Sequence, residues 1–400
     1  MLSFSDARQK VIEVITAMRP QLAHDTIDLP RAAGRVLAVP VAADRNYPPF
    51  DRSTRDGFAL RSADAAAPGA TLTRVGEIKA GGSFDGTVAA GECVQIMTGA
   101  PVPAGADAVA MIEQTRMEGE RVTFERAAAP GQNIVARGSE ARAGEELLAA
   151  GTRLSYAEMA LAAQVGSAKV EVFATPSVAI LSTGDEVVDV AAKPGPFQVR
   201  NGNGIALETL VVRAGARPYQ MGNAADEVSV LRRAIERGLE ADVLILSGGV
   251  SMGKYDLVEK VLAELGAEFF FDAVAIRPGR PAVFGRCRKK PVFGLPGNPV
   301  STMVTFELFV VPALDILSGT AARPLKITGA RLTHPVHEKP GMTHFLPARL
   351  DSVRGEPVVA AMPWQGSGDT VTLARANALL VVPAERSDWE TGEWAGVIPR

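Results

Sequence analysis

The sequence predicts a multidomain protein of the α/β plus β class, in which an α/β domain is combined with β-rich regions. The chain has 400 residues, more than the ~150 residues of one ordinary domain. Strand-like and helix-like segments alternate from Pro176 to Leu317, which is typical of parallel strands covered by helices. Short β-type runs separated by glycine and proline extend from Asn46 to Gln132 and follow Leu325.

The first 174 residues predict a helical/mixed domain that is interrupted by a β-rich insert. An apolar stripe from Val11 to Met18 has helical spacing, and Pro20 ends it. A second helix over Tyr156–Val165 precedes a strand over Lys169–Phe173. Between them lie the β-type runs Thr71–Lys79, Glu92–Met97 and Ala108–Glu113. The expected domains are therefore 1–45 with 144–174 (helical/mixed), 46–143 (insert), 175–323 (α/β) and 324–400 (β).

The α/β domain is expected to contain a parallel sheet with helices on both faces. Its predicted strands are Ser177–Leu181, Val243–Leu246, Glu268–Ile276 and Pro291–Gly294, and its predicted helices are Asn203–Ala214, Asp226–Gly238, Asp256–Leu265 and Ser301–Leu317. In the tail, strands over Ala378–Val382 and Glu393–Ile398 indicate a small β-barrel or sandwich.

Composition excludes several classes of protein. Lysine plus arginine (42) nearly balances aspartate plus glutamate (45), for a net charge of -3, which argues against a nucleic-acid or membrane-surface partner. Cys93 and Cys287 lie far apart without a CxxC pair, so neither a disulfide framework nor a zinc site is expected. The amino terminus has no signal-peptide pattern, and no run approaches ~18 apolar residues. We expect a cytoplasmic protein.

Three glycine-rich loops follow predicted strands of the α/β domain directly. They are STGDE at 182–186, SGGVSMG at 247–253 and GLPGNPVS at 294–301. Because the carboxyl ends of parallel strands share one edge, these loops predict a single ligand pocket. Glycine lets backbone N–H groups approach an oxyanion. The alternative is that all three are ordinary strand-to-helix turns. The candidate phosphate-binding residues are Ser182, Thr183, Gly184, Gly248, Gly249, Ser251, Pro296, Gly297, Asn298 and Ser301.

Charged residues near these loops refine the kind of ligand. Asn298 and Pro299 fit a helix N-cap followed by proline, so the helix amino terminus would favour a phosphate. Asp185, Glu186 and Asp256 would then lie beside that phosphate, which predicts a bridging Mg²⁺. Alternatively, Asp185 and Glu186 cap a following helix. The sequence has no GxxxxGK[ST] or GxSxG motif, and its four histidines lack metal-ligand spacing, which predicts surface or hydrogen-bonded histidines.

Basic residues offer a second anion site. Arg277 and Arg280 in RPGRP place two guanidinium groups on a rigid turn, where they could clamp an oxyanion. The cluster Arg286–Lys290 instead predicts a solvated hairpin tip. In the insert, the segments NYPPFDRSTRDGFA at 46–59 and MTGAPVP at 97–103 are rich in turn-forming residues. Their residue types do not indicate a particular reaction.

Taken in order, the motifs resemble the molybdopterin molybdenumtransferase family, which includes the MoeA proteins and the gephyrin E-domain. The motifs are PPFDRSTRDGFA (48–59), MTGAPVPAGADAV (97–109), LSTGDEV (181–187), SGGVSMGKYD (247–256), RPGRP (277–281), GLPGNPVS (294–301), GSG (366–368) and ARAN (374–377). The resemblance implies a three-layer molybdopterin-binding domain, a carboxyl-terminal β-barrel and an elongated homodimer. It also implies a cleft between the α/β domain of one subunit and the insert of the other.

The resemblance further implies an activity and residue roles. Members insert molybdate into adenylylated molybdopterin and release AMP, with Mg²⁺ assisting. Asp56, Thr98, Glu186 and Asp256 match catalytic positions, and Ser367 matches a barrel residue that reaches the cleft. The metal positions fall on Asp185, Glu186 and Asp256. Asp226 lies near a further acidic position of the family.

Five positions depart from the family pattern. Arg277 and Arg280 replace two lysines, which changes oxyanion geometry. Lys254 stands where relatives often have an acidic residue. Glu140 replaces an aspartate, and a barrel arginine falls on Pro347, with Arg349 as its substitute.

Two alternative functions follow from the same features. A pterin adenylyltransferase has a similar α/β domain, and a non-catalytic dimeric scaffold resembles the other role of gephyrin. Tungstate is nearly isosteric with molybdate, so the sequence does not separate these two oxyanions. Expected macromolecular partners are a second copy of this chain, a pterin adenylyltransferase and maturation proteins of molybdenum enzymes, with no nucleic acid or membrane.

Overall fold

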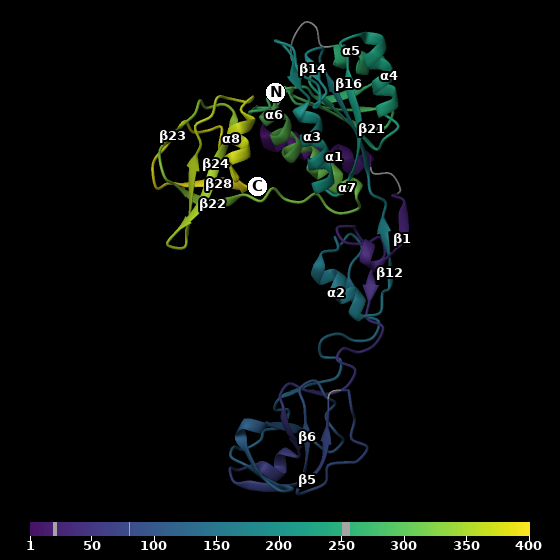
Figure 1. The fold of residues 1–400 in the computed structure, drawn as a ribbon, viewed down its shortest axis with the longest axis vertical. Helices are drawn as coiled ribbons and strands as arrows, with labels where there is room; N and C mark the ends of the chain where they lie inside the picture. Colours follow the sequence, from purple (N-terminus) through teal and green to yellow (C-terminus); the bar gives the residue numbers. More distant parts are fainter. Residues whose placement is uncertain (19–21, 80, 250–256) are drawn as a thin grey trace.

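The computed structural model describes residues 1–18, 22–79, 81–249 and 257–400. The chain is elongated, and Figure 1 shows three levels along its length. An α/β body and a carboxyl-terminal barrel lie side by side at one end. A small domain with α2 (Tyr156–Gln164) lies in the middle, and the β-rich insert forms the opposite end.

A six-stranded sheet forms the centre of the α/β body. Its order is β16-β13-β17-β21-β20-β18. The first four strands are parallel, as predicted, whereas β20 and β18 are antiparallel to their neighbours. The bounds are β13 (Ser177–Thr183), β16 (Arg217–Ala224), β17 (Val243–Ser247), β18 (Glu268–Phe271), β20 (Val283–Cys287) and β21 (Lys290–Leu295).

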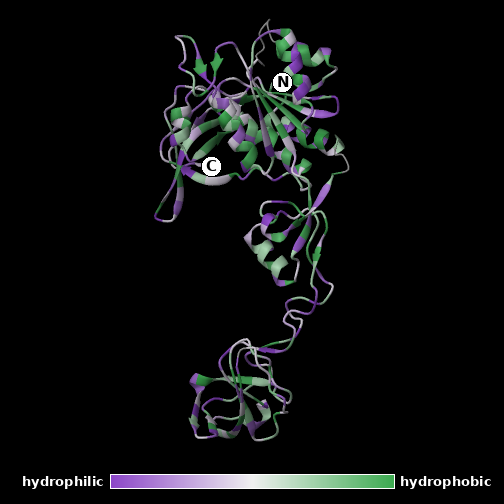
Figure 2. Ribbon diagram, turned by 45° about the vertical axis from the view of Figure 1, so that its right-hand side comes forward, coloured by the Kyte–Doolittle hydropathy of each residue, from purple (hydrophilic) through white to green (hydrophobic). Residues whose placement is uncertain are grey.

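The sheet is the middle of three layers, which confirms the predicted architecture. Along β13, Val178 and Ile180 face one apolar cluster, whereas Ala179 and Leu181 face the other, because successive strand residues point to opposite sides. Figure 2 shows the apolar strands lying between the helices. The first cluster is covered by α1 (Phe4–Met18), α3 (Gly202–Arg213), α6 (Pro299–Thr305) and α7 (Val311–Leu317), and the second by α4 (Val228–Gly238) and α5 (Leu257–Glu264).

Two helices of this body differ from the sequence expectations. The predicted helix Ser301–Leu317 begins at Pro299 and contains a π-helical stretch, η4 (Phe306–Val310), between α6 and α7. This run is long and apolar enough to cross a membrane, but most of it is buried in the protein core. The amino-terminal helix α1 packs its buried Ala7, Val11 and Ile15 into the α/β core, although the sequence grouped it with the helical/mixed domain. The apolar stripe of α1 packs against α7, which lies nearly 300 residues later in the chain.

The middle domain is assembled from two separate stretches of chain. Its strands β1 (His24–Asp28) and β12 (Lys169–Phe173) pair antiparallel, as do β2 (Val41–Ala42) and β11 (Glu146–Leu148). A capping box at Ser155 and Glu158 starts α2. Leu37, Leu154 and Val172 lie in one buried cluster, so residues from both stretches form a common core.

The insert is built around a six-stranded sheet with the order β7-β4-β6-β5-β9-β8. Phe58 and Phe124 are buried on one face, and Val94 and Ile96 on the other. The bounds are β4 (Gly57–Leu60), β5 (Ala70–Ile78), β6 (Glu92–Ile96), β7 (Ala108–Met111), β8 (Thr115–Glu118) and β9 (Arg121–Phe124). A β-rich insert was predicted here.

The carboxyl-terminal region is a closed five-stranded barrel. The order β24-β25-β22-β28-β26 closes because β24 also pairs with β26, and β19 (Ile276–Arg277) extends one side. The strands are β22 (Thr328–Leu332), β24 (Thr343–Val353), β25 (Glu356–Ala361), β26 (Ala378–Val382) and β28 (Trp394–Pro399). The helix α8 (Thr370–Arg375) carries barrel residues toward the α/β body. The β-type runs alone left a barrel and a sandwich open, whereas the resemblance implied a barrel. The pairing of β24 with β26 confirms the barrel.

Candidate active site

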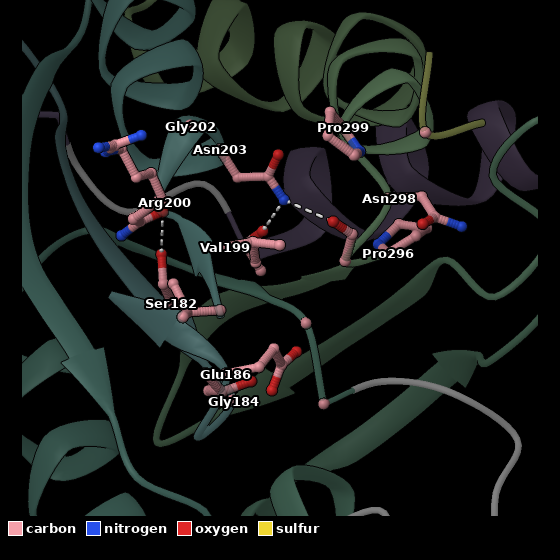
Figure 3. Close-up of a pocket in the computed structure, with 18 of the residues that line it drawn as sticks. Ser182, Gly184, Glu186, Val199, Arg200, Gly202, Asn203, Pro296, Asn298 and Pro299 are labelled. Atoms are coloured by element: carbon pink, nitrogen blue, oxygen red, sulfur yellow. Dashed lines mark hydrogen bonds between the residues drawn. The ribbon is translucent and has the colours of Figure 1, made fainter. Parts of the chain in front are cut away.

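A cleft of 760 Å³ lies where β13, β17 and β21 end (Figure 3). Described residues of all three predicted glycine loops line it, as the prediction of a single pocket requires. Of the predicted ligand-binding residues, the cleft brings together Ser182, Thr183, Gly184, Glu186, Gly248, Gly249, Pro296, Gly297 and Asn298.

Close packing of the second loop encloses a polar atom that has no hydrogen-bond partner among the described residues. Gly248 and Gly249 have positive φ angles of 90° and 62°, which favour glycine. A Cβ at Gly249 would come within 2.7 Å of Thr183 Oγ1 and 2.8 Å of a Val258 methyl carbon. Thr183 Oγ1 is itself buried and has no hydrogen-bond partner among the described residues. A buried hydroxyl without a partner is costly, so Thr183 fits a site that is completed by a ligand.

Two asparagines that the sequence reasoning missed hold the strand-end loops together. Asn203 Nδ2 donates to Ser247 Oγ at 3.0 Å and to Gly297 O at 2.8 Å. Asn201 caps α3 by accepting from Gly204 N at 2.9 Å, and it also accepts from Ser182 Oγ at 3.1 Å. The run of asparagine and glycine at 201–204 signals a helix start, but only the fold places it beside the other loops.

One edge of the cleft is acidic. Glu186 and Asp226 line it, and Asp185 Oδ1 accepts the backbone N–H of Asp226 at 3.1 Å. Burial, followed by repulsion from Asp185 and Glu186, raises the pKa of Asp226. A bound cation would relieve this repulsion. The alternative role of Asp185 and Glu186 as helix caps is wrong, because β14 (Val187–Val188) follows them and the next helix begins at Gly202.

The described residues do not by themselves form a complete metal site. Within the described ranges, no group of three or more His, Cys, Asp or Glu side chains could hold a metal ion. The predicted metal residue Asp256, together with Ser251 and Lys254, lies outside the described residues. Glu186 and Asp226 are the acidic side chains that line the described part of the cleft.

A second cavity of 450 Å³ adjoins the first and contains the two arginines that were predicted to bind an oxyanion. Arg277, Arg280, Ser301 and Ser367 line it, and it shares Pro281, Pro296, Asn298 and Gly368 with the first cavity. Asn298 occupies the predicted N-cap position with Pro299 at the first helical position, but its side chain does not cap the helix. Its Nδ2 instead donates to Ser367 Oγ at 2.9 Å, which ties the barrel to the cleft.

The predicted catalytic residues of the insert lie at the opposite end of the same chain (Figure 1). Asp56 and Thr98 contact each other, since Asp56 Oδ1 accepts Thr98 N at 2.6 Å and Thr98 Oγ1 at 2.7 Å. These two donors, the backbone one first, lower the pKa of Asp56. Neither residue lines the cleft described above.

The other residues that the sequence analysis discussed lie outside the two cavities. Glu140 pairs with Arg52 at 2.6 Å in the insert. Pro347 is buried in β24 and Arg349 is exposed on the same strand. Arg288 and Lys289 form the turn between β20 and β21, with φ angles of 48° and 65°, as predicted for a hairpin tip.

Comparison with known proteins covers nearly the whole chain. The family model described as MoeA N-terminal region (domain I and II) matches residues 2–166, a probable molybdopterin binding domain matches 179–316, and the MoeA C-terminal region (domain IV) matches 329–399.

Relatives and solved structures agree with these matches. A molybdopterin molybdenumtransferase from Nostoc sp. is 35% identical over 394 residues, covering 96% of this chain and 90% of the relative. The one from Bacillus subtilis is 34% identical over 376 residues, covering 91% and 87%. A crystal structure of a molybdopterin biosynthesis MoeA protein from Pyrococcus horikoshii superposes with a TM-score of 0.82 at 28% identity, covering 100% of both chains. The chain therefore belongs to the MoeA family of molybdopterin molybdenumtransferases.

Proposed function

We propose that this chain inserts molybdate into adenylylated molybdopterin, with release of AMP, during the synthesis of the molybdenum cofactor. The observation that carries this proposal is the pair of adjoining cavities, of which one is lined by strand-end glycine loops and the other by two arginines. Such a pair suits a substrate with a pyrophosphate next to a small oxyanion. Full-length relatives named as molybdenumtransferases support the same reaction.

In this proposal the larger cavity binds the phosphates of the adenylylated pterin. Gly248, Gly249 and Gly297 let the backbone approach the ligand closely, and the helix amino terminus at Pro299 favours its negative charge. Thr183 Oγ1, which has no hydrogen-bond partner among the described residues, would donate a hydrogen bond to a phosphate oxygen.

The smaller cavity would bind molybdate as a substrate. Arg277 and Arg280 supply paired guanidinium donors, and Ser301 and Ser367 supply hydroxyl groups. Since these residues and the phosphate loops share Pro296 and Asn298 as a common wall, molybdate would be held next to the reacting end of the pterin. The arginines would also neutralise charge that develops when AMP leaves.

Asp185, Glu186 and Asp256 would hold Mg²⁺. When bound, this ion supplies charge neutralisation for the pyrophosphate. The acidic edge fits a cation because its carboxylates lie close together; burial, and then repulsion from Asp185 and Glu186, raises the pKa of Asp226.

A homodimer would complete the site. Asp56 and Thr98 do not line the cleft of their own chain, and the insert that carries them lies at the other end of the molecule. We therefore place Asp56 and Thr98 of the partner subunit at the cleft. The lowered pKa of Asp56 keeps it ionised, which suits an acceptor for substrate protons or for the cation. We place the reaction in the cytoplasm, consistent with two buried, unpaired cysteines.

The test follows AMP release by purified protein with adenylylated molybdopterin, Mg²⁺ and molybdate. Glu186→Gln should lower kcat by about 100-fold or more, because it removes a charge at the cation edge. The control Glu385→Gln removes an exposed carboxylate of the barrel and should leave kcat unchanged. AMP release that does not depend on molybdate would refute the insertion reaction.

Additional measurements with the same protein distinguish molybdate insertion from the adenylyltransferase and scaffold functions and from a preference for tungstate. Consumption of ATP with free molybdopterin would favour an adenylyltransferase, and absence of turnover in a stable dimer would favour a scaffold. Competition between molybdate and tungstate measures the preference between the two oxyanions.

A further inference from the structure

A third cavity, of 370 Å³, shares no lining residue with the cleft. It lies at the joint where the α/β body, the segment 318–327 and the barrel meet. Its walls are largely apolar. They include Leu210 of α3, Val304 of α6, Val311 of α7, Leu373 of α8 and Ile398 of β28.

Cations outnumber carboxylates around this cavity. Its lining includes the basic side chains of Arg8, Arg213, Arg323, Lys326 and Arg400, and one acidic side chain, Glu307. Glu307 is already paired with Arg213, so it does not neutralise the others.

Arg323 is neutralised by the buried carboxylate of Asp315. Among the described residues, the other three cations, Arg8, Arg400 and Lys326, have only uncharged partners or no partner. Arg8 donates to Leu308 O at 2.6 Å and to Arg323 O at 2.7 Å. Arg400 donates to Leu373 O at 2.6 Å. Lys326 forms no hydrogen bond or ion pair within the described part of the chain. These groups therefore keep N–H donors for a further partner.

The environment of the cavity disfavours the charged forms of Arg8 and Arg400. Burial lowers the pKa of Arg8, and burial followed by repulsion from Arg213 lowers that of Arg400. An anion placed between these guanidinium groups would relieve both effects. The apolar walls exclude a fully hydrated inorganic ion as the best-fitting guest and favour a ligand with an apolar body.

We propose that this cavity binds a small organic anion whose apolar body packs on the walls and whose acidic group pairs with Arg8, Arg400 and Lys326. A volume of 370 Å³ lies in the range of small-molecule sites. The ligand would contact the α/β body, the connecting segment and the barrel together. The inference is independent of the proposed reaction, since it concerns binding at a separate cavity.

The test uses 8-anilinonaphthalene-1-sulfonate, a fluorescent aromatic sulfonate, titrated into the full chain. We expect one saturable site. Lys326→Glu should weaken the Kd at least about tenfold, because it turns an attractive charge into a repulsive one. Met303→Trp should abolish binding by filling the cavity, which Met303 lines.

The matched control is Lys289→Glu at the exposed hairpin tip, which makes the same charge change away from the cavity and should leave the Kd unchanged. N-phenyl-1-naphthylamine, which lacks the sulfonate, should bind more weakly than the sulfonate. Absence of saturable binding overturns the proposal. So does equal weakening by Lys326→Glu and Lys289→Glu, or unchanged binding in a folded Met303→Trp variant. Circular dichroism and the unfolding midpoint establish that each variant is folded.

Discussion

Asp56 accepts two hydrogen bonds from Thr98. The backbone N–H and the hydroxyl of Thr98 both donate to the same carboxylate oxygen. Because these donors prefer the ionised carboxylate, they lower its pKa. The contact therefore stabilises the fold above the pKa of the unfolded chain and is lost as the pH falls through the folded value.

Thr98→Ala removes one of these donors and keeps the other. We expect the pKa of Asp56 to rise but to stay below its ordinary value, since the backbone N–H is the larger cause. Carboxyl-carbon NMR titration of Asp56 measures this change, with Asp107 as an internal reference held by Ser62. An unchanged pKa of Asp56 would contradict the side-chain contribution.

At the scale of elements, the three loops at the ends of β13, β17 and β21 tolerate different substitutions. Gly249 combines a positive φ with close contacts to Thr183 and Val258. A Cβ at Gly297 would meet only Gly248 Cα, at an ordinary 3.5 Å. The two glycines of the same cleft therefore differ: Gly249 is required by its backbone conformation and close packing, whereas Gly297 borders open space in the cleft.

We expect Gly249→Ala to lower the free energy of unfolding by about 1–3 kcal/mol, the range for a strained backbone position. Gly297→Ala should change it by less than about 0.5 kcal/mol. Both variants should lose activity in the AMP assay. Urea denaturation separates the two effects, and equal destabilisation by both substitutions would contradict this assignment.

The sequence predicted the elements better than it predicted their partners. Strand–glycine–helix patterns located the loops of β13, β17 and β21, because strand ends and glycine are both visible locally. The strand β16 was missed because its sequence, RPYQMGNA, is polar and largely exposed. The strand β20 was missed as a strand, although the hairpin tip beside it was predicted.

Contacts between distant segments were beyond local patterns. The stripe on α1 predicted a helix, but not that its partner would be α7. Asn203 gave a turn signal, yet its bonds to Ser247 and Gly297 depend on three strands ending together. Conversely, Asp56 and Thr98 were singled out through the resemblance, since their own surroundings suggested only a turn.

At the scale of the whole molecule, one buried carboxylate connects three parts of the chain. Asp315 of α7 is 1% exposed. It accepts Arg153 Nη2 of the middle domain at 3.3 Å and the backbone N–H of Arg323, in the segment leading to the barrel, at 3.0 Å. Arg323 Nε also donates to it at 2.8 Å. The same side chain thus contacts both the middle domain and the segment leading to the barrel.

Asp315→Asn should lower the free energy of unfolding by about 3–5 kcal/mol, because it leaves two arginines without their buried partner. It should also widen two distance distributions measured by electron–electron resonance between spin labels. One pair joins Met117→Cys in the insert to Val212→Cys on α3, and the other joins Val353→Cys in the barrel to Val212→Cys. These positions are exposed.

The companion variant Arg153→Met removes only the contact to the middle domain. It should widen the insert distance and leave the barrel distance unchanged. Equal distributions in the parent chain and in a folded Asp315→Asn variant would refute this role of Asp315. Cys93 and Cys287 are buried, and burial raises the pKa of Cys93 to about 12, so neither thiol competes for the label.

The packing of α1 against α7 also has a consequence for synthesis on the ribosome. The helix α1 emerges first, but its partner Val311–Leu317 follows roughly 290 residues later, which takes about 15–60 s at the usual rates of translation. During that interval Val11 and Ile15 lack their final cover. The insert, whose two cores draw only on residues between Phe58 and Ile134, can fold in the meantime. The nascent chain would therefore complete its most distant domain before the body that carries it.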